Sequence, residues 1–457
     1  MMHIEEQTIV AQATAKGPGA IGMIRLTGVD VFDIVARAVR LAGDKNFTDL
    51  ATHTIHYGWV IDALGAHIDQ VLVLVMKAPK TFTGQHVVEI TCHNNQFLIE
   101  RIIDRLISCG ARLAQAGEFT RRAVIAGKID LIQAEAINDL ISAQSEVGMK
   151  AALAQLEGSL SSWIVDIENK LVEAVVLCEA SFEFLDEEMS FDELILARMR
   201  ELETTMQSVL STFDKQQYIK QGVRIALVGS TNAGKSSLFN ALLNKNRAIV
   251  TDIEGTTRDT LEAGLFRQGM HLTLVDTAGL RQTDDVIERQ GIDRSFEEVA
   301  SADVVLVVYD ASRSYQPHEL AVYKSVLAQY VDKVILVQNK IDLGSQLLFA
   351  DICSSIAVSA VTKVGLEELY QVVHKKINQL LGGGATPYLL NQRQYTLLYA
   401  AQQSLASLVK RYQAVAIEYE LLAHDLKMVL AQLEELTGKT VSEKTFDAVF
   451  RSFCVGK

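Results

Sequence analysis

Short apolar runs of strand length mark the N-terminal part of the chain. The clearest runs span residues 21–26, 71–76 and 87–90, and turn residues separate them. One helical pattern, residues 96–107, follows these runs. Strands mixed with a helix in this way predict an α+β N-terminal domain.

Hydrophobic residues recur at helical spacing between about residue 129 and residue 218. The recurring positions are Leu153, Leu156, Leu160, Trp163, Ile167 and Leu171. We expect them to share one helix face, because residues three and four apart lie on the same side of a helix. No proline lies between Pro79 and Pro317, so none breaks a long helix here. Core packing explains a stripe of this kind.

A third pattern alternates strands with helices between residues 220 and 380. Strand-like runs span residues 223–228, 271–275, 304–309, 334–338 and 356–358. This alternation predicts a mostly parallel, doubly wound α/β sheet. The glycines at 382–384 then break the chain, and residues 394–436 are helical again.

Together these patterns predict a multidomain protein with one domain inserted into another. Residues 1–122 form the α+β domain, and residues 219–380 form the inserted α/β domain. Residues 123–218 and 381–457 form the two parts of a discontinuous helical domain. Insertions are tolerated where the ends of the inserted domain lie close together.

Composition and charge limit the kinds of partner. A chain of 457 residues is too long for one ordinary core, and 49% hydrophobic with 22% charged residues suits a globular protein. The formal net charge of -13 makes the chain a poor general phosphate binder. A nucleic-acid contact would therefore be a local patch or be shared with a partner.

The cellular setting follows from what the chain lacks. The N-terminus shows no secretory signal, and the most apolar runs are too short to span a bilayer. The five cysteines are scattered and show no metal-binding spacing. We therefore expect a cytoplasmic protein with no membrane span.

A P-loop motif follows the first strand of the inserted domain. It reads Gly229-Ser-Thr-Asn-Ala-Gly234-Lys235-Ser236, and a helix follows it. Its glycines let backbone N–H groups turn toward phosphates, and the helix N-terminus adds a favourable dipole. Lys235 is placed for the β/γ oxygens and Ser236 for Mg²⁺. The predicted loop and helix-start contacts are Asn232, Ala233, Gly234, Lys235, Ser236 and Ser237.

Three further motifs follow at the ends of later strands. Asp276 and Gly279 belong to an Asp-Thr-Ala-Gly motif that holds Mg²⁺ through water and senses the γ-phosphate. The guanine-recognition residues are Asn339, Lys340, Asp342, Ser359 and Ala360. Asp342 is suited to the N1 and N2 donors of guanine. Four elements in this order, each at a strand end, predict a Ras-like GTPase domain.

One catalytic part of Ras-type enzymes is missing. Leu280 follows Gly279, where a water-orienting glutamine would stand. Thr256 or Thr257 could complete the Mg²⁺ shell, and Arg258 is a candidate in-cis arginine. The nearest acidic candidate for holding the water is Glu288, which could equally be an exposed helix-start carboxylate.

The whole chain resembles the bacterial MnmE (TrmE) family of tRNA uridine-modification GTPases. The N-terminal segments that carry the resemblance are residues 7–14, 22–26, 82–84, 87–90, 117–123 and 127–131. The tail Phe453-Cys454-Val455-Gly456-Lys457 is similar to the family's C-terminal Cys-x-Gly-Lys signature.

The resemblance implies how the missing glutamine is replaced. Family members are activated by dimerisation of their GTPase domains, and K⁺ supplies the charge of an arginine finger. Thr257 matches the Mg²⁺ ligand of the switch loop, and Glu288 matches the water-orienting glutamate. The matched K⁺ contacts are Asn232, Thr251, Ile253 and Thr256, with Thr251 also among the expected GTP contacts.

The resemblance also implies a folate site. The family's N-terminal domain binds 5-formyltetrahydrofolate or a related tetrahydrofolate, which contributes a one-carbon unit. The matched positions are Arg25, Glu89, Lys128 and Lys457. The chain departs from the family at residues 15–20, without the usual proline-rich arginine loop, and at residues 93–95, where His-Gly-Gly is common.

The implied partners define the reaction. Family members form a homodimer and, with the flavoprotein MnmG (GidA), a heterotetramer. Together they add an aminomethyl-type group, as in carboxymethylaminomethyl derivatives, at carbon five of the tRNA wobble uridine. Two alternatives stay open, a ribosome-assembly or RNA-binding GTPase switch and a folate-dependent transferase with a regulatory GTPase. The first usually carries a basic or KH-like module, and no GXXG loop in a basic setting is evident.

Overall fold

The fold was analysed in a computed structural model. It describes residues 7–43, 45–183, 191–213, 216, 218–219, 222–244, 261–267, 270–276, 299–344, 346–349, 354–381, 388–451 and 453–456. The chain divides into two compact units. One holds residues 1–138, 154–203 and 396–457, and the other holds residues 139–153 and 204–395. No described helix is both long and apolar enough to cross a membrane.

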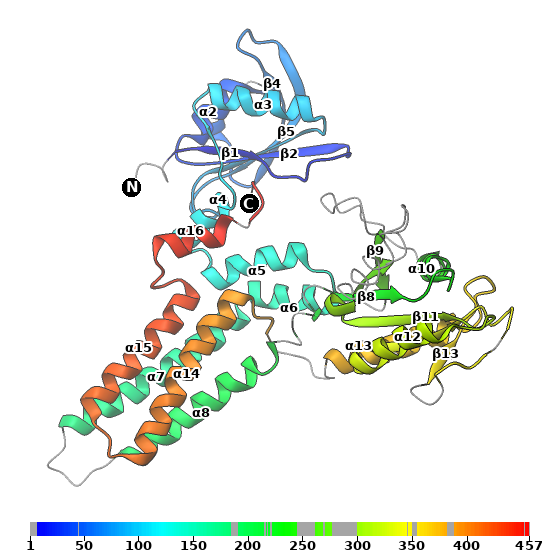
Figure 1. The fold of residues 1–457 in the computed structure, drawn as a ribbon. Helices are drawn as coiled ribbons and strands as arrows, with labels where there is room; N and C mark the ends of the chain where they lie inside the picture. The colour runs from blue at the N-terminus through cyan, green and yellow to red at the C-terminus, as the bar shows by residue number, and fades with distance from the viewer. Residues whose placement is uncertain are drawn as a thin grey trace. The chain divides into compact units, whose positions relative to one another are not determined.

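A seven-stranded sheet forms the N-terminal domain of the first unit (Figure 1). Its strand order is β3-β4-β5-β6-β2-β1-β7. The strands are β1 Ile9–Gln12, β2 Ile21–Thr27, β3 Val39–Leu41, β4 Thr54–Ile61, β5 His67–Met76, β6 Val87–His93 and β7 Arg112–Leu113. The helical elements of this domain are α2 Val31–Ala38, η1 Phe47–Asp49, α3 Gln96–Ser108 and α4 Glu118–Ile125. The sequence therefore predicted the α+β class correctly.

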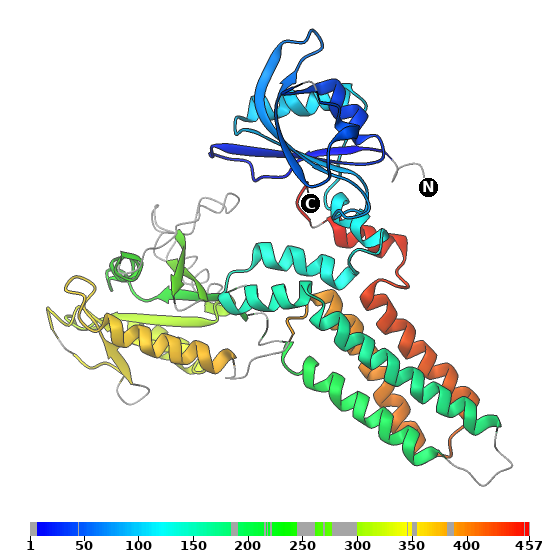
Figure 2. The same ribbon diagram turned by 180° about the vertical axis from the view of Figure 1, so that it is seen from behind.

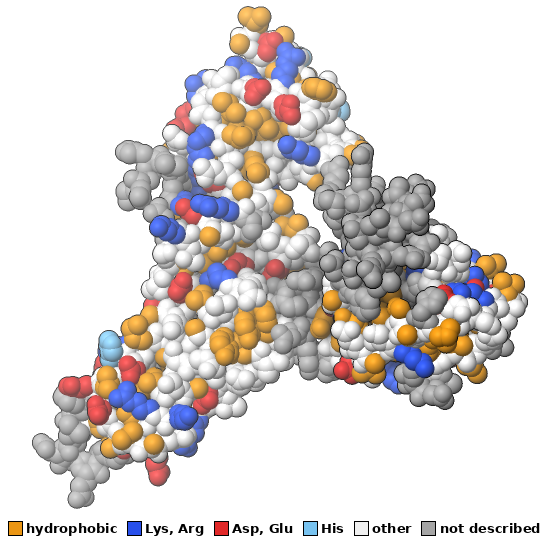
Figure 3. Space-filling view, viewed as in Figure 1, with side chains coloured by type: hydrophobic (Ala, Val, Ile, Leu, Met, Phe, Trp, Pro, Cys, Tyr) orange, Lys and Arg blue, Asp and Glu red, His pale blue; other side chains and the backbone are white. Residues whose placement is uncertain are grey.

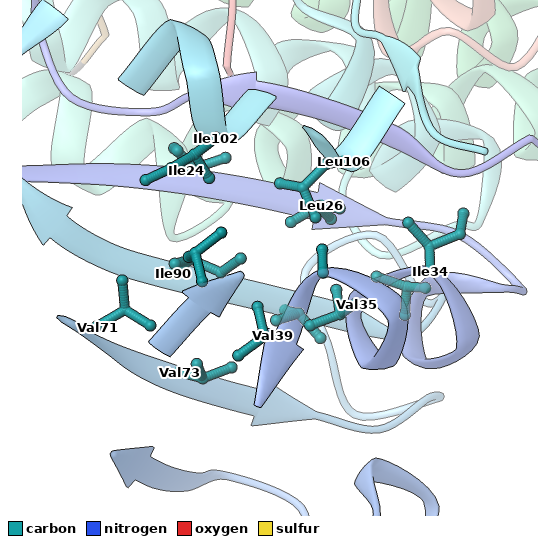
Figure 4. Packing of buried hydrophobic residues seen from close by; sticks show 14 of the residues in the cluster. Ile24, Leu26, Ile34, Val35, Val39, Val71, Val73, Ile90, Ile102 and Leu106 are labelled. Atoms are coloured by element: carbon teal, nitrogen blue, oxygen red, sulfur yellow. The ribbon is translucent and has the colours of Figure 1, made fainter. Parts of the chain in front are cut away.

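The core of this domain lies between the sheet and two helices (Figure 4). Alternate residues of a strand point to the same face, so one face of β2, β5 and β6 is apolar. That face carries Ile24, Leu26, Val71, Val73 and Ile90. Helices α2 and α3 cover it with Ile34, Val35, Ile102 and Leu106. Burying each such side chain stabilises the fold by about 1.5–3 kcal/mol.

Helices α7, α8, α14 and α15 lie side by side in both ribbon views (Figure 1 and Figure 2). The helices of the helical part are α5 Leu131–Ser142, α6 Glu146–Leu156, α7 Ser159–Glu183, α8 Asp192–Leu210, α14 Gln392–Ala414, α15 Tyr419–Thr437 and α16 Glu443–Arg451. Lys427 pairs with Glu179 at 2.8 Å, and Lys439 pairs with the buried Glu168. The first pair joins α7 to α15, and the second joins α7 to the residue after the Gly438 cap of α15, so the two helices run antiparallel.

The prediction that the residues from Leu153 to Leu171 share one helix face is wrong. The stripe crosses from α6 to α7 at Gly158, whose φ of +98° is a left-handed conformation that ends a helix. Leu153 is 45% exposed on α6, whereas Leu160, Ile167 and Leu171 are buried on α7. Periodicity continued across the break because a glycine does not interrupt a hydrophobic pattern.

The second unit contains a six-stranded, mostly parallel sheet in the order β13-β12-β11-β8-β10-β9. Its strands are β8 Val223–Val228, β9 Leu261–Arg267, β10 Met270–Asp276, β11 Val304–Asp310, β12 Val334–Asn339 and β13 Ser355–Ala357. Only β9 among these pairings runs antiparallel to its neighbour. The five strand runs predicted from sequence match β8, β10, β11, β12 and β13 to within a residue, whereas the antiparallel β9 was not predicted.

Helices cover both faces of this sheet. They are α10 Lys235–Asn244, α12 Pro317–Gln329 and α13 Leu366–Leu381. Leu238 of α10 and Leu369 of α13 share one apolar cluster with the strands. Tyr323 and Leu327 of α12 belong to the cluster on the other face. The doubly wound arrangement is therefore confirmed.

The segment 139–153 belongs to this second unit. The backbone N–H of His271, at the start of β10, donates to the carbonyl oxygen of Gln144 at 3.0 Å. The buried Ser145 hydroxyl donates to the carbonyl oxygen of Ile219 at 2.7 Å. No residue pattern in the sequence indicated that a turn between α5 and α6 would bond to the nucleotide domain.

Candidate functional site

The P-loop turns sharply between β8 and α10. Asn232 and Gly234 have left-handed backbones, with φ of +61° and +88°. A Cβ on Gly229 would lie 2.1 Å from the carbonyl oxygen of Val308, and one on Gly234 would lie 2.2 Å from Nδ2 of Asn339. Both glycines are therefore required by close packing, which leaves the loop backbone free to face a ligand.

Lys235 begins α10 and reaches back across the loop. Its Nζ donates to the carbonyl oxygens of Gly229 at 2.6 Å and Ser230 at 2.8 Å. The residue is only 7% exposed. The ammonium group is thus held at the first turn of the loop, close to the helix N-terminus where an anion is favoured.

The hydroxyls expected to meet Mg²⁺ and phosphate are open to solvent. Ser236 and Ser237 are exposed at the start of α10, and Asn232 is exposed in the loop. Ala233 between them is fully buried. A glycine cradle with exposed oxygen donors and a buried lysine fits a Mg²⁺-nucleotide triphosphate.

The expected guanine-recognition loop packs directly against the P-loop. Nδ2 of Asn339 donates to the carbonyl oxygen of Ala233 at 2.9 Å, and its Oδ1 accepts from the N–H of Ala360 at 3.2 Å. Asn339 and Ser359 are buried, whereas Asp342 is exposed. The structure therefore brings three separate motifs together at the carboxyl ends of β8, β12 and β13.

Lys340 is fixed by an ion pair beneath this loop. Its Nζ donates to Oδ2 of Asp310 at 2.7 Å, and Lys340 has a left-handed φ of +64°. Burial raises the pKa of Asp310, but the bonds from Lys340 and Ser312 outweigh it, so the pKa is lowered below its usual value. Asp310 is thus an ionised anchor for the lysine.

Several predicted site residues lie outside the described part of the chain. They are Thr251, Ile253, Thr256, Thr257, Arg258, Gly279, Glu288 and Lys457. Asp276 is the last residue of β10, and its carboxylate is not among the described side chains. The roles expected of these residues stay predictions.

A second cluster of charged groups lies in the N-terminal domain. Arg25 and Glu89 are directly opposite each other on β2 and β6, and Nε of Arg25 donates to Oε1 of Glu89 at 2.7 Å. Nη1 of Arg25 also donates to the carbonyl oxygen of Gly456 at 3.2 Å. Three of the chain's segments, far apart in sequence, therefore meet at one arginine.

The C-terminal tail is built into this domain. Ala116 and Val455 form an antiparallel bridge, and the N–H of Gly117 donates to the carbonyl oxygen of Cys454 at 3.3 Å. Gly456 has a φ of +97°, and a Cβ there would lie 2.2 Å from the carbonyl oxygen of Gln12. Only glycine fits this approach, so the tail's position depends on it.

Lys128 is bonded elsewhere in the same domain. Its Nζ donates to the carbonyl oxygen of Pro79 at 2.8 Å. The left-handed Gly84 packs beside it, since a Cβ there would lie 3.3 Å from Cε of Lys128. Lys128 therefore links the segment 79–84 to the end of α4.

Family models match both parts of the chain. The model described as GTP-binding protein TrmE N-terminus matches residues 8–128, and the MnmE helical domain model matches residues 131–454. The chain belongs to the MnmE family. It is therefore a GTP hydrolase of tRNA modification.

Relatives of this MnmE-family chain match over its full length. The tRNA modification GTPase MnmE of Moorella thermoacetica is 38% identical, over 99% of this chain and 100% of that protein. The MnmE protein of Aquifex aeolicus is 37% identical with the same coverage. The solved G domain of the T. maritima FeoB iron transporter is 28% identical over 35% of this chain and 98% of its own, with a TM-score of 0.25.

The two departures of this MnmE-family chain from the usual N-terminal pattern contact each other. Nδ2 of Asn94 donates to the carbonyl oxygen of Gly17 at 2.7 Å. The backbone N–H of Asn94 donates to the carbonyl oxygen of Ala20 at 3.1 Å. The side chain of Asn95 caps α3 by accepting from the N–H of Leu98 at 3.3 Å. A single asparagine thus holds the altered loop at residues 15–20.

Sequence reasoning missed residues that hold the nucleotide loops from behind. They are Ser230, Asp310, Arg313, Tyr315 and Tyr323, and they bond to the P-loop, to Lys340 or to one another. Ser230 lies within the P-loop motif but had no predicted role there, and the other four lie outside every predicted motif. A tyrosine on an amphipathic helix is normally a core residue, so its pattern carried no signal.

Proposed function

We propose that this GTPase depends on K⁺, is activated by dimerisation, and modifies carbon five of the tRNA wobble uridine with a tetrahydrofolate one-carbon unit. The bond between Asn339 and the P-loop carries the nucleotide part of the proposal, because it joins base recognition to phosphate recognition. Family membership carries the tRNA part.

Each predicted site residue has a proposed task toward GTP. Asp342 would accept from guanine, and Asn339 and Ser359 hold the loops that present it. Lys235 would donate to the β/γ oxygens, while Ser236 and Thr257 would hold Mg²⁺. The metal supplies positive charge to the phosphates as the terminal bond breaks. Asp276 would hold Mg²⁺ through water, and the Gly279 amide would sense the γ-phosphate.

A monovalent cation is proposed beside the P-loop. Asn232, Thr251, Ile253 and Thr256 would hold K⁺, which supplies charge against the developing negative charge. The exposed, left-handed Asn232 supports this assignment, as does Leu280 in place of a glutamine. Glu288 would orient the attacking water.

Hydrolysis in two salts tests this assignment. GTP turnover of the full chain is measured in KCl and in NaCl for wild type and Glu288→Ala. We expect a strong K⁺ preference for wild type and a loss of about 10²–10³-fold in the variant, as when one transition-state contact is removed. Equal rates in both salts would refute the K⁺ site, and normal turnover by Glu288→Ala would refute the role of Glu288.

The N-terminal cluster is proposed as the folate site. The Glu89 carboxylate suits the donor edge of a pterin, and the cations Arg25, Lys128 and Lys457 suit a folate glutamate tail. The contacts of Arg25 with Glu89 and Gly456 support a site that includes the tail. Calorimetry with 5-formyltetrahydrofolate tests it. Glu89→Gln is expected to bind weakly, and Glu100→Gln, at an exposed position of α3, is expected to bind normally.

A homodimer is proposed through the outer face of the N-terminal sheet. Ile55 and Tyr57 of β4 and Leu72 of β5 are 65%, 44% and 47% exposed, and Tyr57 is directly opposite Leu72. Adjacent exposed apolar residues on a sheet favour a protein contact. Sedimentation of Ile55→Asp should give monomers, whereas an unchanged dimer would place the interface elsewhere.

The flavoprotein partner MnmG (GidA) is proposed to supply much of the tRNA surface in a heterotetramer in the cytoplasm. On the face drawn in Figure 3, Lys and Arg side chains are interspersed with Asp and Glu over the described surface. Such a surface, on a chain of net charge -13, favours shared RNA binding. Nucleoside analysis of tRNA from a deletion strain tests the reaction, and a normal wobble uridine modification there would refute it.

A further inference from the structure

Ser230, the second residue of the P-loop, is held at each of its polar groups. Its N–H donates to the hydroxyl of Tyr323 at 2.7 Å, and its own hydroxyl accepts from Nη2 of Arg313 at 3.0 Å. Its carbonyl oxygen accepts from Nζ of Lys235 at 2.8 Å. The residue therefore connects the phosphate-binding lysine with two side chains outside every nucleotide motif.

Tyr323 is a fixed acceptor for this loop. It lies on α12, is 5% exposed, and donates its hydroxyl proton to the carbonyl oxygen of Val308 at 2.8 Å. The same hydroxyl also lies 3.2 Å from Oγ of Ser230. With its proton in the shorter bond to Val308, the Tyr323 oxygen accepts from the Ser230 N–H. Burial raises the pKa of Tyr323, so the phenol keeps its proton at any physiological pH.

Arg313 is held as firmly from the other side. Its guanidinium forms two hydrogen bonds with Glu319, at 2.8 and 3.3 Å, and lies 4.0 Å from the ring centre of Tyr315. A planar fork bound to a carboxylate and stacked on a ring has little freedom. The guanidinium therefore directs one N–H at the Ser230 hydroxyl, while Glu319 and the Tyr315 ring hold the rest of the group.

We propose that Tyr323 and Arg313 are positioning residues that set the Ser230 carbonyl and, through it, the ammonium group of Lys235 for the phosphates of GTP. Neither side chain touches the nucleotide in this scheme. The alternative is that both merely attach α12 to the sheet, in which case they affect stability but not nucleotide affinity. The inference rests on the proposed role of Lys235.

The first test is Tyr323→Phe in the full-length chain, with Tyr330→Phe as the matched control. Tyr330 ends the same helix, and its ring lies against Lys333. The Tyr323 variant leaves the Ser230 N–H without its acceptor, and we expect GTP to bind about tenfold more weakly. GDP should be affected less, since it lacks the γ oxygens that Lys235 would also reach.

A change confined to melting temperature would overturn the proposal. If Tyr323→Phe melts earlier but binds GTP and GDP as the control does, the tyrosine only stabilises the fold. Lys235→Ala tests the proposed role of the lysine separately from the positioning role of Tyr323. Normal GTP binding by Lys235→Ala would refute the role of the lysine itself, whereas a failure of the tyrosine test alone leaves that role intact.

The second test is a double-mutant cycle between Arg313 and Ser230. The variants are Arg313→Ala, Ser230→Ala and the double substitution, and the measured quantity is GTP affinity. Because Arg313 acts through the serine hydroxyl, the double variant should be no weaker than the weaker single variant. Additive losses would show that Arg313 acts by another route and would overturn its assignment. Unchanged affinity in both single variants would overturn it as well.

Discussion

Nδ2 of Asn339 donates to the carbonyl oxygen of Ala233 at 2.9 Å, across 106 positions of sequence. The same side chain accepts from the N–H of Ala360 through Oδ1. One buried amide therefore uses both ends to connect the P-loop, the Asn-Lys-x-Asp loop and the loop after β13. This side chain fixes the positions of the three loops relative to one another. In the proposed function it would thereby align phosphate recognition with base recognition without itself touching the base.

Replacing Asn339 with alanine should weaken nucleotide binding without unfolding the domain. The substitution removes the donor to the buried carbonyl oxygen of Ala233 and the acceptor of the partly buried Ala360 N–H, at a cost of about 1–3 kcal/mol. We expect GTP affinity to fall about 10- to 100-fold, measured with a fluorescent GTP analogue. Asn378→Ala, at an exposed asparagine of α13, is the control. Equal affinities of the two variants would contradict the connecting role.

A methyl group at Gly234 should disrupt the same contact. Alanine there would place Cβ 2.2 Å from Nδ2 of Asn339 in a backbone with φ of +88°. The overlap and the backbone strain together cost several kcal/mol, so nucleotide binding should fall about a hundredfold or more.

Gly43→Ala, in the N-terminal domain, is the control for the stability cost of backbone strain alone. Gly43 has a φ of +80°, and a Cβ there has nothing within 4 Å. This variant should lose about 1–2 kcal/mol of stability and keep its nucleotide affinity. A Gly234→Ala chain that binds GTP as well as Gly43→Ala does would show that the loop can move away from Asn339.

The parallel strands of the nucleotide domain could be predicted because most of them are continuous apolar runs, whereas Glu262 and Gly264 interrupt the run of the antiparallel β9, which was missed. Every residue of β11, Val304–Asp310, is buried, and such runs are typical of parallel strands covered on both faces. The P-loop could be predicted because its glycines are required by close backbone approach. The helix break at Gly158 could not, since a left-handed glycine leaves the hydrophobic spacing unchanged.

The contacts behind the nucleotide loops could not be predicted for a different reason. Tyr323 has the spacing of a core residue on α12, and its hydroxyl gives no sign in sequence of which backbone group it meets. The partner of Arg25 is similarly hidden, because Gly456 is 431 positions away. Local patterns predict elements and motifs, whereas such contacts depend on how distant segments pack.

The buried carboxylate of Glu118 should make the N-terminal domain sensitive to acid. It accepts from Arg112 at 2.6 and 3.0 Å and from Arg122 at 3.0 Å, and the residue is 6% exposed. Burial raises the pKa of Glu118, but the bonds from Arg112, Gln115 and Arg122 outweigh it, so the pKa lies below the usual 4.5. The stabilisation is therefore complete above pH 4.5 and is lost as the pH falls through the lowered pKa.

Glu118→Gln provides the measurement. Removing one partner of a buried pair costs about 3–5 kcal/mol, so the variant should be less stable by about that amount at pH 7. The difference in unfolding free energy should stay constant down to about pH 5 and shrink in more acid solution. Glu146→Gln is the control, because Glu146 pairs with Lys150 on the exposed surface of α6. A difference that grows in acid would contradict the assigned charge state.

The last prediction concerns the tail, which should leave its place when Gly456 is replaced with alanine. Its Cβ would lie 2.2 Å from the carbonyl oxygen of Gln12, and φ is +97°. The Ala116–Val455 bridge and the bond from Arg25 to the Gly456 carbonyl both depend on the path of the tail at Gly456. We therefore expect carboxypeptidase to release the tail residues faster and 5-formyltetrahydrofolate to bind more weakly. GTP hydrolysis should change little. Gly65→Ala, with a φ of +84° and nothing within 4 Å, is the control. Equal release of the tail from both variants would mean that the contact with β1 does not hold it, and Arg25 would then have to keep Glu89 in place without the Gly456 carbonyl.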